Sequence, residues 1–253
     1  MQREVTTNSL ARCAGLEEAN EDIPDTDRYR ALILELYHLQ SAPKEHQDSV
    51  FCEIAASYLP QLVNKYRISE GPVNIAMTFL NNVTNTPYFV RFSRLPEAQG
   101  LVDLQARRII EAPDNGENFN YDELGAACQF LLTLIVYEGG RDFTDQDRQL
   151  LIHKANSWHD LFRGTGLHIE ESCDLLVKYL EHDERTIMIT KLIKRAQDSK
   201  LLQCGFPGCE QLQEKDGPIF KQCPRCKSTV YCNDDHQAQA WAGHKHLCFE
   251  PVF

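Results

Sequence analysis

Eight cysteine and histidine residues near the end of the sequence constrain the fold more than any other feature. Six of the ten cysteines fall between Cys204 and Cys248, with two histidines among them. The string reads Cys204-x4-Cys209-x13-Cys223-x2-Cys226-x5-Cys232-x3-His236-x7-His244-x3-Cys248. Clustered cysteines with interleaved histidines, in a chain whose N-terminus lacks the apolar core of a secretory signal, indicate metal ligands rather than disulfides. Eight such ligands are the number that two tetrahedral zinc ions use.

The spacing of these ligands predicts their local structure. Two residues separate Cys223 from Cys226, so both sulfurs can face one ion across a tight knuckle. Cys232 and His236 are four residues apart, as are His244 and Cys248, and residues four apart share one helix face. Each of these two pairs needs an N-terminal pair to complete a tetrahedron. His246 lies only two residues from Cys248, so the spacing favours His244 as the ligand.

The ligand string resembles the MYND-type zinc fingers. The resemblance also rests on Tyr231-Cys232 and on Gln237-x3-Trp241-x2-His244, and it covers residues 204–248 only. In that family the ions are cross-braced, which implies one zinc on Cys204, Cys209, Cys232 and His236 and a second zinc on Cys223, Cys226, His244 and Cys248. This sequence departs from the family at the first pair, where x4 replaces the usual x2, and at His236, where cysteine is usual. Imidazole is a good zinc ligand, so the ligand count is kept.

The segment after Cys232 is predicted to be a helix capped by Asn233 or Asp234. Gln237, Trp241, His244 and Cys248 follow at spacings of 4, 3 and 4, which is one helical stripe, so Trp241 is expected beside the second zinc. Trp241 has an ordinary role in covering a module too small to own a core. The resemblance implies a second role, because some MYND fingers hold short proline-rich peptides with this Gln and Trp.

Residues 27–200 read as a series of amphipathic helices, after a flexible N-terminus at 1–26 and before the finger at 201–253. Thr144 is expected to cap one helix, Pro60 to kink or split another, and Pro72 to open a third. Four helices start about 24 residues apart, near the half-period of armadillo and HEAT repeats. No repeated residue signature accompanies the spacing. The predicted fold class is therefore all-α, an irregular helical array with a regular solenoid as an open alternative.

Charge and segment composition exclude several classes of protein. The net charge is −11, and residues 1–200 carry 21 basic against 31 acidic residues. Such a chain offers no basic stripe for phosphates, so nucleic-acid binding is disfavoured. The longest uncharged apolar stretch, at 124–137, is shorter than a membrane span of about 20 residues. A soluble, intracellular protein of the cytoplasm or nucleus is expected, without a membrane partner.

The function that these features predict is protein interaction: a zinc-binding adaptor whose finger binds proline-containing segments of partners. A transcriptional regulator or corepressor component and a substrate adaptor of a ubiquitin ligase remain alternatives. No catalytic residue is assigned, because closed four-ligand zinc sites are structural and no phosphate loop or nucleophile elbow is present. A small-molecule substrate is therefore not expected. A SET-type lysine methyltransferase is disfavoured because the sequence has no β-rich catalytic part. His46 and Asp48 match half of an iron facial triad, but in helical surroundings.

Overall fold

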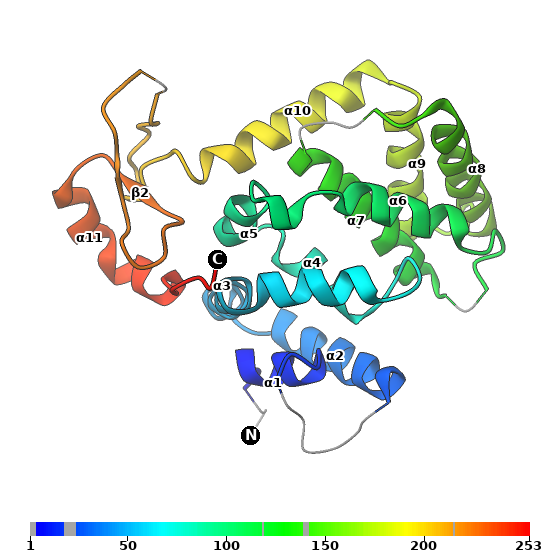
Figure 1. Ribbon diagram of the computed structural model, residues 1–253, viewed down its shortest axis with the longest axis horizontal. Coiled ribbons are helices and arrows are strands. Elements are labelled where there is room, and N and C mark those ends of the chain that lie inside the picture. Colours follow the sequence, from blue (N-terminus) through cyan, green and yellow to red (C-terminus); the bar gives the residue numbers. More distant parts are fainter. Residues whose placement is uncertain (1–3, 18–23, 118, 139–141, 215) are drawn as a thin grey trace. The chain divides into compact units, whose positions relative to one another are not determined.

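The computed structural model describes residues 4–17, 24–117, 119–138, 142–214 and 216–253. Within them almost all regular structure is helical (Figure 1). The α-helices are α1 (Thr7–Cys13), α2 (Asp25–Gln40), α3 (Lys44–Ile68), α4 (Ile75–Val83), α5 (Pro87–Phe92), α6 (Leu101–Glu111), α7 (Tyr121–Glu138), α8 (Asp145–Leu161), α9 (His168–Leu180), α10 (Glu184–Ser199) and α11 (Asp234–His244). Two short 3₁₀ turns are η1 (Pro96–Ala98) and η2 (Lys245–Leu247), and two strands are β1 (Lys221–Gln222) and β2 (Val230–Tyr231). The predicted all-α class is confirmed.

The helix starts follow local capping chemistry. Thr144 accepts a hydrogen bond from the Asp147 amide, 3.1 Å away, and begins α8 as predicted. Asn74, not Pro72, begins α4, because its side chain accepts from the Met77 amide at 2.9 Å. Pro60 lies inside α3, which continues to Ile68, so the predicted split is wrong. Flanking residues Leu59 and Leu62 are fully buried, and this packing holds the helix together across the proline.

The N-terminal segment is not uniformly flexible. Residues 7–13 form α1, which Thr6 caps by accepting a hydrogen bond from the Ser9 amide. Leu10 and Ala11 on this helix are fully buried, and α1 packs against α2. The prediction of a flexible 1–26 is therefore corrected for α1, while residues 1–3 and 18–23 lie outside the described residues.

The chain divides into two compact units whose boundaries differ from the predicted ones. Unit 1 comprises Met1–Asn64, Asn82–Glu97 and Ala196–Phe253; unit 2 comprises Lys65–Asn81 and Ala98–Arg195. The division falls within α3, α4 and α10. The zinc-finger segment belongs to unit 1 with α1, α2 and α5, so it does not form a unit separate from all the helices. No helix in the described part of the chain has the length and apolar composition needed to cross a bilayer.

In unit 2, α6, α7, α8 and α9 pack around a core that contains a buried polar network. α6 packs against α7 and α8, and both α7 and α8 pack against α9. Gln105 is fully buried; it accepts a 2.6 Å hydrogen bond from the Tyr66 hydroxyl and donates to the carbonyls of Pro72 and Ala127. Its amide thereby ties three chain segments together. Because every polar atom of that side chain has a partner, the network fixes one arrangement of the core.

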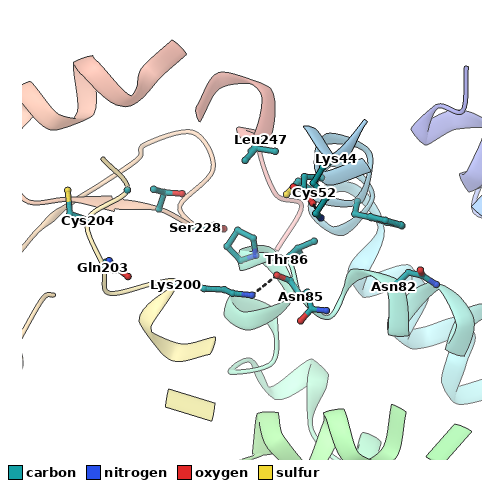
Figure 2. A pocket seen from close by; sticks show the side chains of 15 residues that line it. Lys44, Cys52, Asn82, Asn85, Thr86, Lys200, Gln203, Cys204, Ser228 and Leu247 are labelled. Atoms are coloured by element: carbon teal, nitrogen blue, oxygen red, sulfur yellow. Dashed lines mark hydrogen bonds and ion pairs between the residues drawn. The ribbon is translucent and has the colours of Figure 1, made fainter. Parts of the chain in front are cut away.

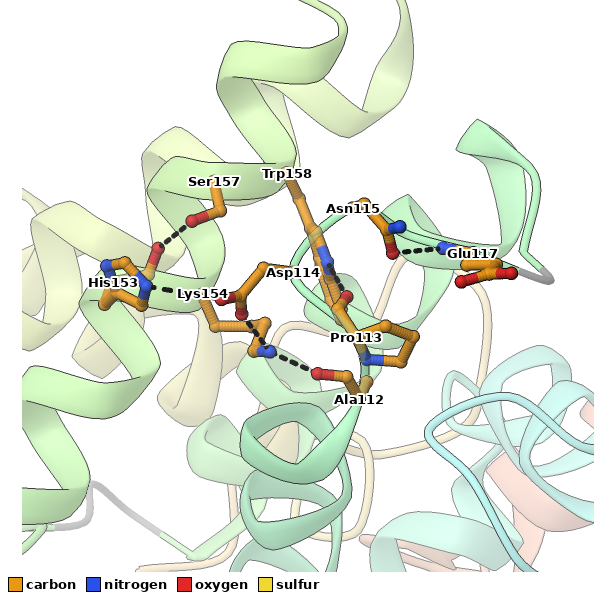
Figure 3. Close-up of polar contacts among 9 residues, drawn as sticks. All are labelled: Ala112, Pro113, Asp114, Asn115, Glu117, His153, Lys154, Ser157 and Trp158. Atoms are coloured by element: carbon orange, nitrogen blue, oxygen red, sulfur yellow. Dashed lines mark hydrogen bonds and ion pairs between the residues drawn. The ribbon is translucent and has the colours of Figure 1, made fainter.

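A buried lysine is hydrogen-bonded to the turn that follows α6 in the same unit. Lys154 of α8 has only 6% of its surface exposed, and its ammonium donates to the Ala112 carbonyl and the Asp114 carboxylate (Figure 3). The neighbouring Trp158 indole donates to the Pro113 carbonyl at 3.1 Å. The hydrogen bond and charge of Lys154 hold the pKa of Asp114 below its usual range. The turn after α6 is thus fixed by side chains of α8.

The lowered pKa of Asp114 predicts a pH-dependent stability. A carboxyl whose folded-state pKa is depressed stabilises the fold above its unfolded pKa of about 3.9, and this contribution disappears as pH falls through the folded value. Asp114→Asn is therefore expected to lower the thermal midpoint of unit 2 at pH 7, with the difference from wild type vanishing in strong acid. Asp142→Asn, at an exposed acid of the same unit, is the control. A difference that persists unchanged at low pH, followed by circular dichroism, would contradict the assignment.

Candidate functional site: two cysteine–histidine clusters

The finger has very little regular structure to position its side chains. β1 and β2 form an antiparallel two-stranded sheet in which Lys221 pairs with Tyr231 and Gln222 with Val230. Asn233 caps α11 by accepting a 2.8 Å hydrogen bond from the His236 amide, which confirms the first of the two predicted caps. Lys221 and Asp234 form an ion pair at 2.5 Å between β1 and the start of α11. These contacts set the direction of the helix that carries two of the ligands.

The first cluster brings together Cys204, Cys209, Cys232 and His236. The Nδ1 atom of His236 lies 3.1 Å from the Cys232 sulfur and 3.5 Å from the Cys204 sulfur. The Cys209 and Cys232 sulfurs are 4.0 Å apart. Tetrahedral zinc with Zn–S bonds of about 2.3 Å separates its sulfur ligands by about 3.8 Å, so the spacing fits one ion. The Phe206 ring stacks on His236 with centroids 4.4 Å apart and fixes the imidazole plane.

The second cluster brings together Cys223, Cys226, His244 and Cys248. The Cys223 and Cys248 sulfurs are 3.7 Å apart, and the Cys226 sulfur lies 3.6 Å from Nε2 of His244. His244 therefore presents Nε2, whereas His236 presents Nδ1. Burial lowers the pKa of His244, which keeps its imidazole neutral and its lone pair available. The two clusters reproduce the predicted cross-braced sets.

The unusual x4 spacing of the first pair is absorbed by a tight turn. The Cys209 amide donates to the Phe206 carbonyl at 3.0 Å, with Pro207 and Gly208 between them. Gly208 has φ = 82°, a left-handed conformation that glycine adopts without steric cost. Proline followed by glycine is the pattern of a type II turn. The turn returns the Cys209 sulfur to the cluster, so the longer spacing keeps Cys204 as a ligand.

The chemistry of the donors fits zinc. Burial and the nearby thiolates, Cys226 foremost, raise the pKa of Cys248 to about 12, because several anions in one enclosed site repel one another. A divalent cation removes that repulsion and keeps the sulfurs deprotonated. Three thiolates and one imidazole fill the four positions of a tetrahedral ion in each cluster. The eight residues therefore would hold two Zn²⁺ ions whose role is structural.

The residues on either side of the last ligand, Cys248, and those that follow it attach the finger to the helices of unit 1. The buried Tyr88 hydroxyl of α5 donates to the Leu247 carbonyl at 2.8 Å and accepts from the Phe249 amide at 2.7 Å. Farther along, the Val252 amide donates to the Ala56 carbonyl of α3 at 3.0 Å, and the Phe253 ring packs edge-on against Phe92. Sequence reasoning missed this attachment, although the apolar residues Phe249, Val252 and Phe253 close together after the last ligand were a signal for it.

A cavity of ≈ 550 Å³ lies where the finger meets α3, α5 and the end of α10. Figure 2 shows Lys200 reaching Asn85, whose carbonyl accepts its hydrogen bond at 2.8 Å. Burial lowers the pKa of Lys200. On the α3 side Cys52 is buried, and desolvation raises the pKa of its thiol to about 12, which makes it unreactive. The lining also includes Lys44 and Asp48, which pair with each other, and Cys204 of the first cluster.

The comparisons with known proteins agree with this geometry. Residues 204–248 match the family model described as MYND finger. No curated protein and no solved structure matches the chain. The C-terminal segment is thus a MYND finger, a zinc-binding module that mediates protein–protein interaction, joined to helices that carry no family match.

The remaining sequence candidates have separate positions. Gln237 is half-buried on α11, and Trp241 is 47% exposed, with its ring 6.0 Å from that of His244. The predicted neighbourhood of Trp241 and the second cluster is confirmed. Elsewhere in unit 1, His46 contacts the Val5 carbonyl through Nε2 at 2.8 Å, and Asp48 pairs with Lys44. These two side chains are engaged with different partners.

The clusters predict metal stoichiometry. Purified protein is expected to contain two zinc ions per chain, one for each cluster, and Cys226→Ala to retain one or none while the finger unfolds. Cys13→Ala is the matched control, because Cys13 lies on α1 outside both clusters. Elemental analysis of freshly purified protein measures the ratio. One ion or none in the wild type, or two in Cys226→Ala, would overturn the assignment.

Proposed function

We propose that this protein is an adaptor whose MYND finger binds proline-containing segments of partner proteins. The observation that carries the proposal is the exposure of Trp241, 47% of its surface, in a module where Tyr231 and Phe220 are buried. A tryptophan needed only to cover the core would be enclosed like these two rings. A half-exposed indole beside a rigid metal site is instead a typical anchor for a partner.

The neighbouring residues support an extended peptide as the ligand. Gln237 lies one turn before Trp241 on the same face of α11 and offers an amide that can both donate and accept hydrogen bonds. Proline-containing segments keep a preordered, extended backbone with unpaired carbonyls, so they lose little entropy when an aromatic ring and an amide hold them. The zinc ions fix the backbone of the finger and leave both side chains available for contact.

Binding can be followed by tryptophan emission, because the chain has two tryptophans and Trp158 is fully buried in unit 2. Titration with a panel of proline-containing peptides is expected to shift the emission of Trp241. Trp241→Ala should weaken binding by about 2 kcal/mol or more, the usual loss for an aromatic anchor, measured by calorimetry. Gln237→Ala should weaken it less and leave the zinc content at two per chain.

Gln239→Ala is the matched control for Gln237→Ala. Gln239 is exposed on α11, two residues from Gln237 and so on the other side of the helix. The control should bind like the wild type. If Trp241→Ala and Gln237→Ala keep two zinc ions and still bind every peptide that the wild type binds, the proposal of peptide binding by these side chains fails.

The proposal assigns no catalysis to the chain. Its metal sites have four protein ligands each, which leaves no position for water or substrate. Recruitment of substrates to a ubiquitin ligase and a corepressor role are both adaptor functions of this kind. Thiol ligands need a reducing compartment, so the proposed location is inside the cell, which imaging of a tagged chain would test. Methyl transfer or hydroxylation by the purified protein, abolished by a point substitution, would contradict the absence of turnover.

A further inference from the structure

We propose that unit 1 contains a second binding site, for a phosphoryl group, beside the knuckle formed by Cys223 and Cys226 and without Trp241 in its lining. The site is a cavity of ≈ 180 Å³ between α5, the end of α10 and the loop that joins β1 to β2. Ligands of drug size occupy about 300 Å³ or more, so this volume suits a single small group rather than a whole cofactor. Its lining residues are Arg91, Arg94, Leu201, Gln222, Lys227, Ser228, Thr229 and Val230.

The positive charge of the cavity favours an anionic ligand. Its described lining includes Arg91, Arg94 and Lys227 and no acidic residue, although the whole chain has a net charge of −11. Asp198, outside the lining, pairs with Arg94 at 2.9 Å. Arg94 shares its charge with Asp198, and the lining itself remains cationic. A phosphoryl group, which carries a charge of about −1.5 to −2 near neutral pH, suits such a lining.

An unsatisfied hydrogen-bond donor also indicates an anion site. The Nη1 atom of Arg91 is buried and has no hydrogen-bond partner. The rest of this guanidinium is held in place, because Nη2 donates to the Phe253 main-chain oxygen at 3.0 Å and the group lies 5.2 Å from the centre of the Phe253 ring. A buried cationic N–H without an acceptor is costly. An oxyanion in the cavity that Arg91 lines would supply the acceptor.

The backbone conformation of Lys227 supports the same site. This residue has φ = 53°, in the left-handed region where glycine fits without strain and a residue with a Cβ atom does not. It directly follows the second thiol of the knuckle, and its side chain is exposed. A knuckle needs only the turn, which glycine would form more easily. Lysine at a strained position beside two arginines points to a role for its charge.

Lys227→Gly tests the proposal without unfolding the finger, because it relaxes the backbone while removing the cation. The full-length zinc-bound protein is titrated with inorganic phosphate at constant ionic strength, and binding is followed by phosphorus NMR line widths. The wild type is expected to show saturable binding at one site. Lys227→Gly should bind at least about tenfold more weakly, as expected for the loss of a charge-assisted contact, while it keeps two zinc ions and an equal or higher thermal midpoint.

Arg225→Ala is the matched control, because Arg225 lies two residues from Lys227 in the same knuckle but does not line the cavity. It should keep phosphate binding. Equal losses in Arg225→Ala and Lys227→Gly would mean that phosphate responds only to overall charge and would overturn the proposal. So would a Lys227→Gly variant that gives up zinc more readily to a chelator yet binds phosphate normally, since Lys227 would then serve the metal site alone.

Two further titrations define the ligand and distinguish this site from the proposed peptide contact at Trp241. A short peptide with one phosphoserine is titrated beside the same peptide with glutamate. Tight binding of the phosphoserine peptide identifies a phosphorylated side chain as the source, and binding of inorganic phosphate alone identifies the free ion. Equal binding of the glutamate peptide would contradict a dianion site. Trp241→Ala should leave phosphate binding unchanged. The phosphoryl site can therefore fail its test while peptide binding by Trp241 passes, and the reverse also holds.

Discussion

The bonds between zinc and the thiolates stabilise the fold of the C-terminal part of this structure. In the described residues of the finger the regular structure is two strands of two residues each, one α-helix of 11 and a short 3₁₀ turn, which bury too little apolar surface to fold unaided. Its interior is packed around the ligands: Tyr231 is fully buried, and a Cβ on Gly205 would clash with Thr229 and lie 3.2 Å from the Tyr231 ring. The free energy of metal binding is therefore the free energy that orders this segment.

The features that the sequence predicted well are those set by neighbours along the chain. Ligand spacing, the cap of α11 at Asn233 and the cap of α8 at Thr144 depend on residues within four positions of one another. The pairing of ligands across 28 residues (Cys204 to Cys232) and 21 residues (Cys223 to His244) came from resemblance to MYND fingers, because spacing alone left the N-terminal partner of each pair open. Resemblance therefore supplied what local chemistry did not.

The features that the sequence did not predict depend on contacts between distant segments. Pro60 lacks an amide hydrogen to donate and should interrupt a helix, yet burial of Leu59 and Leu62 outweighs that loss. The unit boundaries follow packing, so segments far apart in the chain join the finger in one compact body. The cationic cavity combines residues near positions 91 and 227, which no single stretch of sequence could reveal.

One side chain gives the metal site an influence beyond the finger. Tyr88 of α5 hydrogen-bonds the main chain of Leu247 and of Phe249, the two residues on either side of the ligand Cys248. A change in the backbone at Cys248 therefore reaches α5 directly through this buried hydroxyl. By thermodynamic linkage, anything that favours the packed state of α5 also favours zinc binding, and the reverse holds with the same coupling free energy. The helices of unit 1 thus become part of what sets the zinc affinity of this protein.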